Sequence, residues 1–252
     1  MPIRHLLPLP LIGMLAGTFG ASVAVAAGEV LITQQGALQG GVTPGDDPGF
    51  PVTISKPGTY GFASPINVKE EDRNGIVIQA PDVTVDLNGF TLHGRGKGNI
   101  GIKGGRRSAT IRNGTITGFK GIGVEGAGDF WIVEKMRIVA NGGTGIALGT
   151  GSFARILRST VAANQASGIF CGPACHIEGN SVAGNTMTGI FISTGMVRGN
   201  SIIGNGGIGL HTLIGAGFAT GYGHNTLIGN DGGNTSGDLG VIDPNACSPP
   251  CP

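Results

Sequence analysis

The hydrophobic positions of this chain recur with a long period and a short internal alternation. A glycine followed by an aliphatic residue returns at intervals of 26, 20, 24, 23, 21 and 20 residues: Gly75-Ile76, Gly101-Ile102, Gly121-Ile122, Gly145-Ile146, Gly168-Ile169, Gly189-Ile190 and Gly209-Leu210. In the clearest repeats an outward position and a second apolar position follow, which is the period of two of a β-strand. A repeat of this length predicts stacked coils.

Two more short strands fit into each coil. The second strand is centred on an inward aliphatic residue, and the third has its inward residue five positions later. The second-strand residues are Ile111, Val133, Ile156, Ile177 and Val197, and the third-strand residues are Ile116, Ile138, Val161, Val182 and Ile202. Three short strands per coil follow from this constant offset.

Asparagines form two columns along the repeats. The first column lies between the second and third strands and contains Asn88, Asn113, Asn180, Asn200 and Asn225, with Lys135 and Ser159 as interruptions. The second column closes the third strand and contains Asn141, Asn164, Asn185, Asn205 and Asn230. Asparagine tolerates the left-handed backbone region, and its amide can bond the turns above and below. We expect both columns to mark bends and to form ladders.

Short parallel strands with asparagine at the bends resemble the right-handed parallel β-helix of the pectate-lyase-like superfamily. The phrases from Val83 to Gly89 and from Ala109 to Ile116 are typical of its exported bacterial repeat proteins, and the resemblance covers residues 50–232. It implies an all-β fold: one right-handed parallel β-helix of about seven to nine coils with capped ends, roughly 35–45 Å long.

The N-terminus has the features of an export signal. Arg4 and His5 precede an apolar stretch, and small residues come just before Gly28, so we expect residues 1–27 to be a signal peptide that is removed. No other apolar run is long enough to span a bilayer. The predicted location is therefore secreted or periplasmic, without a stable membrane span.

The remaining chain divides into three parts. Residues 28–50 are expected to be an N-terminal cap, residues 51–232 the β-helix, and residues 233–252 a C-terminal tail fastened by a cysteine loop. The four cysteines are Cys171, Cys175, Cys247 and Cys251. Four cysteines in an oxidising compartment allow three pairings. We favour the two local ones, Cys171 with Cys175 and Cys247 with Cys251.

Composition limits the partners. The chain has 50 glycines, 12% charged residues and a formal net charge of +1. Binding of nucleic acid needs a sustained basic face, which this sequence lacks, so no nucleic-acid partner is expected. On the second strand we expect ion pairs between neighbouring coils, Arg112 with Glu134 and Glu178 with Arg198.

Three outward residues of the first strand form a candidate ligand site. Phe170, Phe191 and His211 occupy the same position in consecutive coils, so their rings are expected to stack about 4.8 Å apart. Such a column can contact sugar rings or a protein partner, or it can be covered as part of the structure. The single Trp131, beside a second strand, is interpreted as a structural ring.

Catalytic and metal signatures are weak. The resemblance implies that a polysaccharide lyase would carry clustered acids for calcium and an Arg or Lys base, and no matching cluster is found. An epimerase of this fold would carry Asp-Pro-His, whereas this chain has Asp243-Pro244-Asn245. Cys171, Cys175 and His176 could bind a metal, but a disulfide is favoured. We expect no metal and no cofactor.

The favoured function is binding of an extended polymer, above all a polysaccharide, on the lateral surface of an exported β-helix. Two alternatives remain open. One is a polysaccharide lyase, hydrolase or epimerase that acts on acidic glycans. The other is a structural or adhesive surface protein. The sequence leans towards a protein without enzymatic activity.

Overall fold

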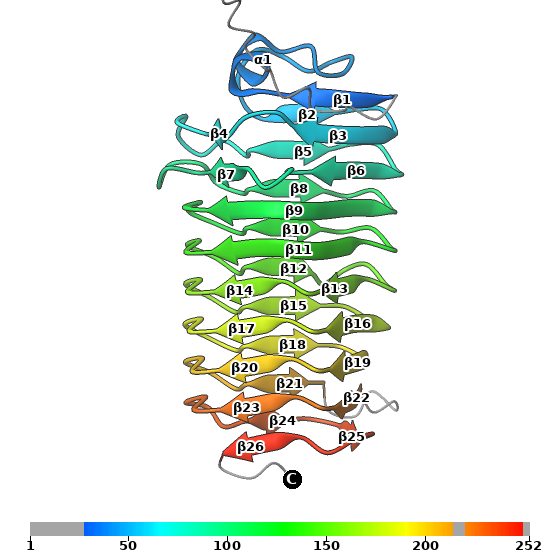
Figure 1. The fold of residues 1–252 in the computed structure, drawn as a ribbon, viewed down its shortest axis with the longest axis vertical. Helices are drawn as coiled ribbons and strands as arrows, with labels where there is room; N and C mark the ends of the chain where they lie inside the picture. The colour runs from blue at the N-terminus through cyan, green and yellow to red at the C-terminus, as the bar shows by residue number, and fades with distance from the viewer. Residues whose placement is uncertain (1–27, 214–219, 249–252) are drawn as a thin grey trace, which may run out of the picture.

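The computed structural model describes residues 28–213 and 220–248. In these residues the chain winds into a single rod of parallel strands (Figure 1). One sheet has nine strands and the other has 17. Nine stacked first strands correspond to about eight turns of the helix, so the predicted fold class and number of coils are confirmed.

Each coil contributes up to three strands. The first strands form the nine-stranded sheet: β2 (Val52–Ile54), β5 (Ile76–Ile78), β8 (Ile102–Gly104), β10 (Val124–Gly126), β12 (Ile146–Leu148), β15 (Ile169–Cys171), β18 (Ile190–Ile192), β21 (Leu210–Thr212) and β24 (Thr235–Ser236). The second strands are β3 (Gly58–Phe62), β6 (Val83–Asp86), β13 (Arg155–Leu157), β16 (Cys175–Glu178), β19 (Gly195–Arg198), β22 (Thr220–Gly223) and β25 (Leu239–Val241). The third strands are β4 (Ile66–Asn67), β7 (Thr91–His93), β14 (Thr160–Ala162), β17 (Ser181–Ala183), β20 (Ser201–Ile203), β23 (Thr226–Ile228) and β26 (Ala246–Ser248). In two coils the second and third strands are continuous, as β9 (Ala109–Thr117) and β11 (Ile132–Val139).

A strand and a short helix cover the N-terminal end of the rod. Strand β1 (Glu29–Ile32) pairs in parallel with β3, and helix α1 (Gln34–Gln39) follows it at the blue end in Figure 1. Thr33 caps the helix, because its hydroxyl accepts a hydrogen bond from the Gly36 amide at 2.9 Å. These elements satisfy backbone groups that the first coil would otherwise expose.

The interior is a stack of branched aliphatic side chains. The ten residues predicted to point inward from the second and third strands all have 0% exposure. Trp131 also has 0% exposure. Its indole fits because Gly104 and Gly126 face it, and a Cβ on Gly126 would lie 2.7 Å from the ring. The structural interpretation of Trp131 is confirmed.

The repeated glycine is required by the close stacking of coils. A Cβ on Gly75 would lie 2.6 Å from the Gly101 carbonyl oxygen of the next coil. The prediction from the repeats was wrong in one coil. There the first strand is Val124–Gly126, and the stacked glycine is Gly123 rather than Gly121. Both Gly121-Ile122 and Gly123-Val124 match the repeated phrase, and the second is the one that stacks, because a Cβ on Gly101 would overlap the Gly123 carbonyl oxygen.

The asparagine columns form ladders, but most of their members lie beside the left-handed residue. Asn88 and Asn113 have positive φ angles of 47° and 58°. Further along the rod, positive φ falls on the preceding residue, as in Gly179 before Asn180, and the asparagine is buried. Each buried amide then bonds the next coil, so the ladders are confirmed for the buried asparagines, where the left-handed assignment is wrong. Asn88 and Asn113 stand outside the ladder, because their side-chain amides donate to Phe62 O and to Asp86.

The strands continue beyond residue 232, where the sequence analysis ended the repeats. Strands β24, β25 and β26 pair in parallel with β21, β22 and β23. Asn245 extends the first asparagine ladder, because its Oδ1 accepts from the Asn225 amide at 2.9 Å. The sequence pattern does not reveal the last coil because its strands are short and bury little apolar surface: Val241 is 58% exposed.

One expected disulfide lies within the described residues. Cys171 and Cys175 are bonded, which joins β15 to β16 across a short turn. Cys247 is also disulfide-bonded, and its expected partner Cys251 lies outside the described residues. The expected signal peptide, residues 1–27, lies outside them as well. Among the described helices none is long and apolar enough to cross a membrane.

Candidate functional site

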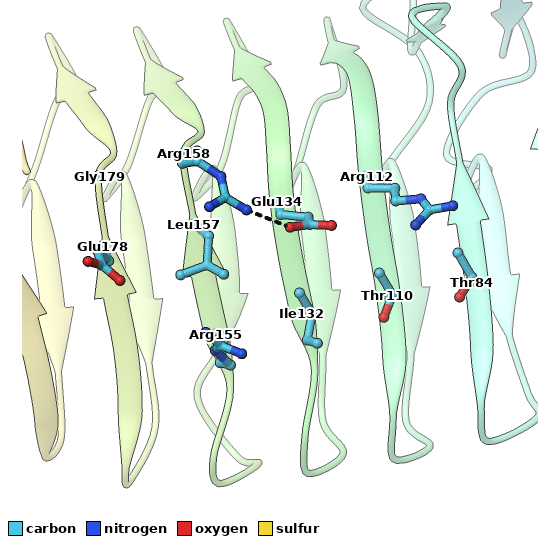
Figure 2. Close-up of a pocket in the computed structure, with 10 residues that line it drawn as sticks. All are labelled: Thr84, Thr110, Arg112, Ile132, Glu134, Arg155, Leu157, Arg158, Glu178 and Gly179. Atoms are coloured by element: carbon cyan, nitrogen blue, oxygen red, sulfur yellow. Dashed lines mark hydrogen bonds and ion pairs between the residues drawn. The ribbon is translucent and has the colours of Figure 1, made fainter.

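A groove runs across the outer face of the second strands. It has a volume of about 580 Å³ and crosses five coils, from β6 through β9, β11 and β13 to β16 (Figure 2). Four strand spacings of about 4.8 Å make it about 19 Å long. Its lining side chains belong to the outward positions of strands whose inward positions form the core, so the repeat itself creates the groove.

The floor of the groove is partly apolar. Leu157 and Ile132 lie in the middle, and the hydroxyl side chains of Thr84 and Thr110 continue the floor towards the N-terminal end (Figure 2). Leu157 is only 7% exposed, although its position in the repeat is outward. The larger polar side chains on both sides therefore stand above it as walls.

Three arginines and two glutamates form these walls: Arg112, Arg155, Arg158, Glu134 and Glu178. Arg158 Nη2 pairs with Glu134 Oε2 at 3.1 Å, and Figure 2 shows this pair bridging two coils. Arg155 is exposed and has no ion pair within the described residues. The groove thus offers arginine donors and carboxylate acceptors above an apolar floor.

The expected pair of Arg112 with Glu134 is wrong. The register places Arg112 opposite both Asp86 and Glu134, and its Nε bonds Asp86 Oδ2 at 2.7 Å. Asp86 is the more buried carboxylate, with a side chain 8% exposed against 22% for Glu134. Asp86 is also held by the Asn88 amide at 2.8 Å. Weaker screening and this fixed geometry favour the pair with Asp86.

The expected pair of Glu178 with Arg198 is wrong as well. Glu178 Oε2 lies 3.0 Å from His176 Nε2 on its own strand. Arg198 Nη2 lies 3.5 Å from Asp243 Oδ2 in the last coil. Asp243 lies in the segment that the sequence pattern assigns to a C-terminal tail, so the pattern does not predict this partner.

The aromatic column forms the expected ladder. Phe170, Phe191 and His211 lie in register on β15, β18 and β21. Their ring centroids are 5.0 Å and 5.1 Å apart. A Cβ on Gly149 would overlap the Phe170 ring, so this ring lies on the Gly149 backbone. The ring faces are therefore largely occupied by neighbours, and Phe170 is 37% exposed.

The candidate metal ligands are not brought together. Cys171 and Cys175 are joined in the disulfide, and His176 contacts Glu178. His211 lies in the aromatic ladder, where its Nδ1 is buried and has no hydrogen-bond partner in the described part of the chain. Within that part, no group of three or more His, Cys, Asp or Glu side chains could hold a metal ion.

The groove was missed by reasoning from the sequence. The sequence places its charged residues at outward positions but predicts ion pairs there rather than a groove. The available signal was the interruption of that column by Leu157, an apolar residue at a position where its neighbours carry charge. An apolar residue flanked by Glu134 and Glu178 in the adjacent coils marks the floor of a groove.

Comparison with known families identifies the class of protein. The family model described as right handed beta helix region matches residues 63–205, and the chain belongs to this family. A search of curated proteins gives no match.

Two solved structures resemble the rod. The Dettilon tailspike protein (gp208) is 14% identical, with a TM-score of 0.52 over 71% of this chain and 41% of that chain. The periplasmic alginate epimerase AlgG is 12% identical, with a TM-score of 0.36 over 87% of this chain and 72% of that chain. The present chain spans less than half of the tailspike chain. At this level of identity the tailspike supports the fold alone.

Proposed function

We propose that this protein binds an extended polysaccharide along the groove of the second strands. The observation that carries the proposal is an open groove that crosses five coils and combines an apolar floor with arginine and glutamate walls. Sugar rings offer both apolar faces and hydroxyl groups, which such a surface can contact together. A linear polymer lying parallel to the rod would meet similar groups at each coil.

The same proposal includes a secreted or periplasmic location. The disulfide between Cys171 and Cys175 supports it, because such bonds persist in oxidising compartments. Cys171 is fully buried in the core, with 0% exposure. The bond is therefore part of the folded coil rather than a surface modification.

Arg155 provides the test of the proposed groove. Its side chain is exposed and has no ion pair within the described residues, so Arg155→Ala should leave the fold intact. We expect a panel of immobilised polysaccharides to include at least one that binds the wild type. Loss of a charge-assisted hydrogen bond should then weaken binding about tenfold or more.

Arg137→Ala is the matched control, because Arg137 is an exposed arginine of β11 outside the groove. It should bind like the wild type. If Arg155→Ala and Arg137→Ala bind equally well, the groove is not the binding site. If the wild type binds no member of the panel, the proposed function is wrong.

A second candidate function is hydrolysis of the bound polysaccharide. Glu134 and Glu178 lie on either side of Leu157 in register, two coil spacings or about 9.6 Å apart along the rod. Inverting glycosidases hold their two carboxyl groups about 6.5–9.5 Å apart, which leaves room for the attacking water. The backbone spacing lies just above this range, so the two side chains would have to incline towards each other in the active arrangement. One glutamate would protonate the leaving oxygen and the other would activate water.

Release of new reducing ends from the polysaccharide that binds would demonstrate hydrolysis. Both Glu134→Gln and Glu178→Gln should abolish this release while binding persists. Binding without any release by the wild type would leave the protein as a binding protein. An unsaturated product absorbing in the ultraviolet would instead indicate a lyase.

The aromatic ladder stays a prediction as a second contact for the polymer. Because the faces of Phe170 and Phe191 are covered, only their outer edges can touch a sugar. We expect the combined change of Phe170→Ala and Phe191→Ala to weaken binding less than Arg155→Ala does. Unchanged glycan binding by this double variant would reject the ladder as a platform.

A further inference from the structure

Two phenylalanines form a ridge at the corner between the first and second strands. Phe130 and Phe153 lie in adjacent coils, with ring centroids 5.3 Å apart and planes inclined by 11°. Phe130 is 51% exposed and Phe153 is 55% exposed. They are therefore more open to solvent than Phe170, the exposed phenylalanine of the ladder.

The backbone of this corner gives no reason for phenylalanine. Both residues have a φ of 60°, in the left-handed region. The same corner position in other coils is also left-handed and holds Asp82, Ser108 and Ala174. Left-handed geometry costs an ordinary residue about 1–2 kcal/mol, and asparagine or glycine relieves it. An exposed ring buries no apolar surface in the core and so does not offset this backbone cost. Folding alone therefore does not explain the two phenylalanines.

Along the chain, each ridge residue lies between residues that line two different hollows. On one side, Ile132 and Arg155, each two residues after a ridge phenylalanine, line the groove of the second strands. On the other side lies a corner hollow of about 740 Å³, whose lining includes Arg106, Arg107 and Gly128. A chain crossing the ridge would thus pass from one hollow into the other.

Cations flank the ridge on both sides. Arg107 and Arg155 are without an ion pair among the residues that the structure describes. The Arg106 guanidinium donates to a backbone oxygen, that of Gln79 at 3.1 Å, and has no ion pair in the described part of the chain. These arginines can therefore bind carboxylate or sulfate groups without breaking an existing pair.

We propose that the Phe130–Phe153 ridge is a ring-stacking site for an anionic polysaccharide, whose acidic groups bind Arg107 and Arg155. The proposal rests on the proposed function and adds a site and a ligand charge to it. Small residues, Ser108 and Ala174, occupy the corner in the coils on either side, and the two rings keep about half of their surface exposed to solvent. A sugar ring can stack on such a face while its acid group reaches an arginine.

Trp131 gives a direct signal of binding at the ridge. It is the only tryptophan, it follows Phe130, and its Nε1 donates to the Arg106 carbonyl oxygen at 2.7 Å. Polygalacturonate and alginate are the probes, with neutral dextran for comparison. We expect the two anionic polymers to shift the tryptophan emission and to bind more tightly than dextran.

The variant combines Phe130→Asn with Phe153→Asn, because asparagine tolerates the left-handed backbone and preserves the fold. Two lost ring contacts should weaken binding about tenfold. The combined change of Phe130→Tyr and Phe153→Tyr keeps both rings, so this variant should bind as tightly as the wild type. Met187→Ala, at an exposed apolar residue 56% open to solvent, is the control and should have no effect.

Each outcome separates the site from the function. If the wild type binds these polymers and the asparagine variant binds as well, the ridge is rejected while polysaccharide binding stands. Equal affinity for dextran rejects the anionic ligand. If the asparagine variant turns a dimer into a monomer without a change in glycan binding, the ridge is a contact between copies and our proposal is wrong. No binding by the wild type rejects the function and the ridge together.

Discussion

Removing one buried asparagine should show how strongly the side-chain ladders hold the coils together. Asn185 is 1% exposed and stands in the middle of the second ladder. Its Nδ2 donates to Val161 O at 3.1 Å and to Asn205 Oδ1 at 2.9 Å. Its Oδ1 accepts from the amide of Asn164 at 3.1 Å and from Asn164 Nδ2 at 3.0 Å. Asn185→Ala therefore removes four hydrogen bonds.

Each such bond contributes about 1 kcal/mol net, so the variant should lose about 4 kcal/mol of unfolding free energy. For a chain of this size that loss corresponds to a fall in Tm of about 8–16 °C. Thermal unfolding followed by circular dichroism measures it. Asn99→Ala is the control, because Asn99 is exposed and has no side-chain hydrogen bond within the described residues. A Tm of the Asn185 variant within about 2 °C of the control would refute the role of the ladder.

Three further changes test other parts of the rod. Gly126→Ala should cost about 1–3 kcal/mol and alter the emission of Trp131, because the added methyl group would overlap the indole; an unchanged Tm and spectrum would contradict this packing. Replacing Cys171 and Cys175 by serine should lower the free energy of unfolding by about 2 kcal/mol, the chain-entropy value for so short a loop, and reduction should lower the Tm of the wild type by more than that of the serine variant, which keeps only the disulfide of Cys247. Burial first, and then the charge of Arg95, lower the pKa of His93 from 6.5. The folded state thus disfavours the protonated ring. The contribution of His93 to the free energy of unfolding is therefore complete above pH 6.5 and is lost as the pH falls below that value. The Tm of the wild type should fall more than that of His93→Asn between about pH 7.5 and pH 5.5, and equal falls would show that His93 is not responsible.

The inward half of the fold could be predicted because burial leaves a strict pattern. An inward position must be apolar in every coil, and its spacing is fixed by the strand period. Ile111 and Ile116, like their counterparts in four further coils, are fully buried as expected. The repeat pattern was ambiguous where two phrases satisfied the same rule, at Gly121 and Gly123, and it missed the last coil, whose strands bury little. The close approach of the next coil decided between the two phrases, and no local pattern records that contact.

The outward half could be predicted only in part. Sequence register correctly placed Phe170 beside Phe191 and Arg112 beside Glu134. It could not decide which of two opposed carboxylates Arg112 would choose, because that choice depends on how deeply each one is buried. The repeat sets which residues lie opposite each other, whereas side-chain conformation and screening decide which of them form ion pairs. The repeat places the residues that line the groove, and Leu157 is its signal in the sequence, but the walls depend on the side-chain conformations that only the structure shows.

The corner ridge illustrates a general property of this architecture. At the corner the backbone must be left-handed, and the side chain of that residue then points away from the core, as the exposure of Phe130 and Phe153 shows. The next residue, Trp131, points inward and is fully buried. A corner residue can therefore be exchanged without disturbing the packing beside it. Because folding restricts it only through the backbone, an unfavourable choice such as phenylalanine points to selection for what the surface contacts.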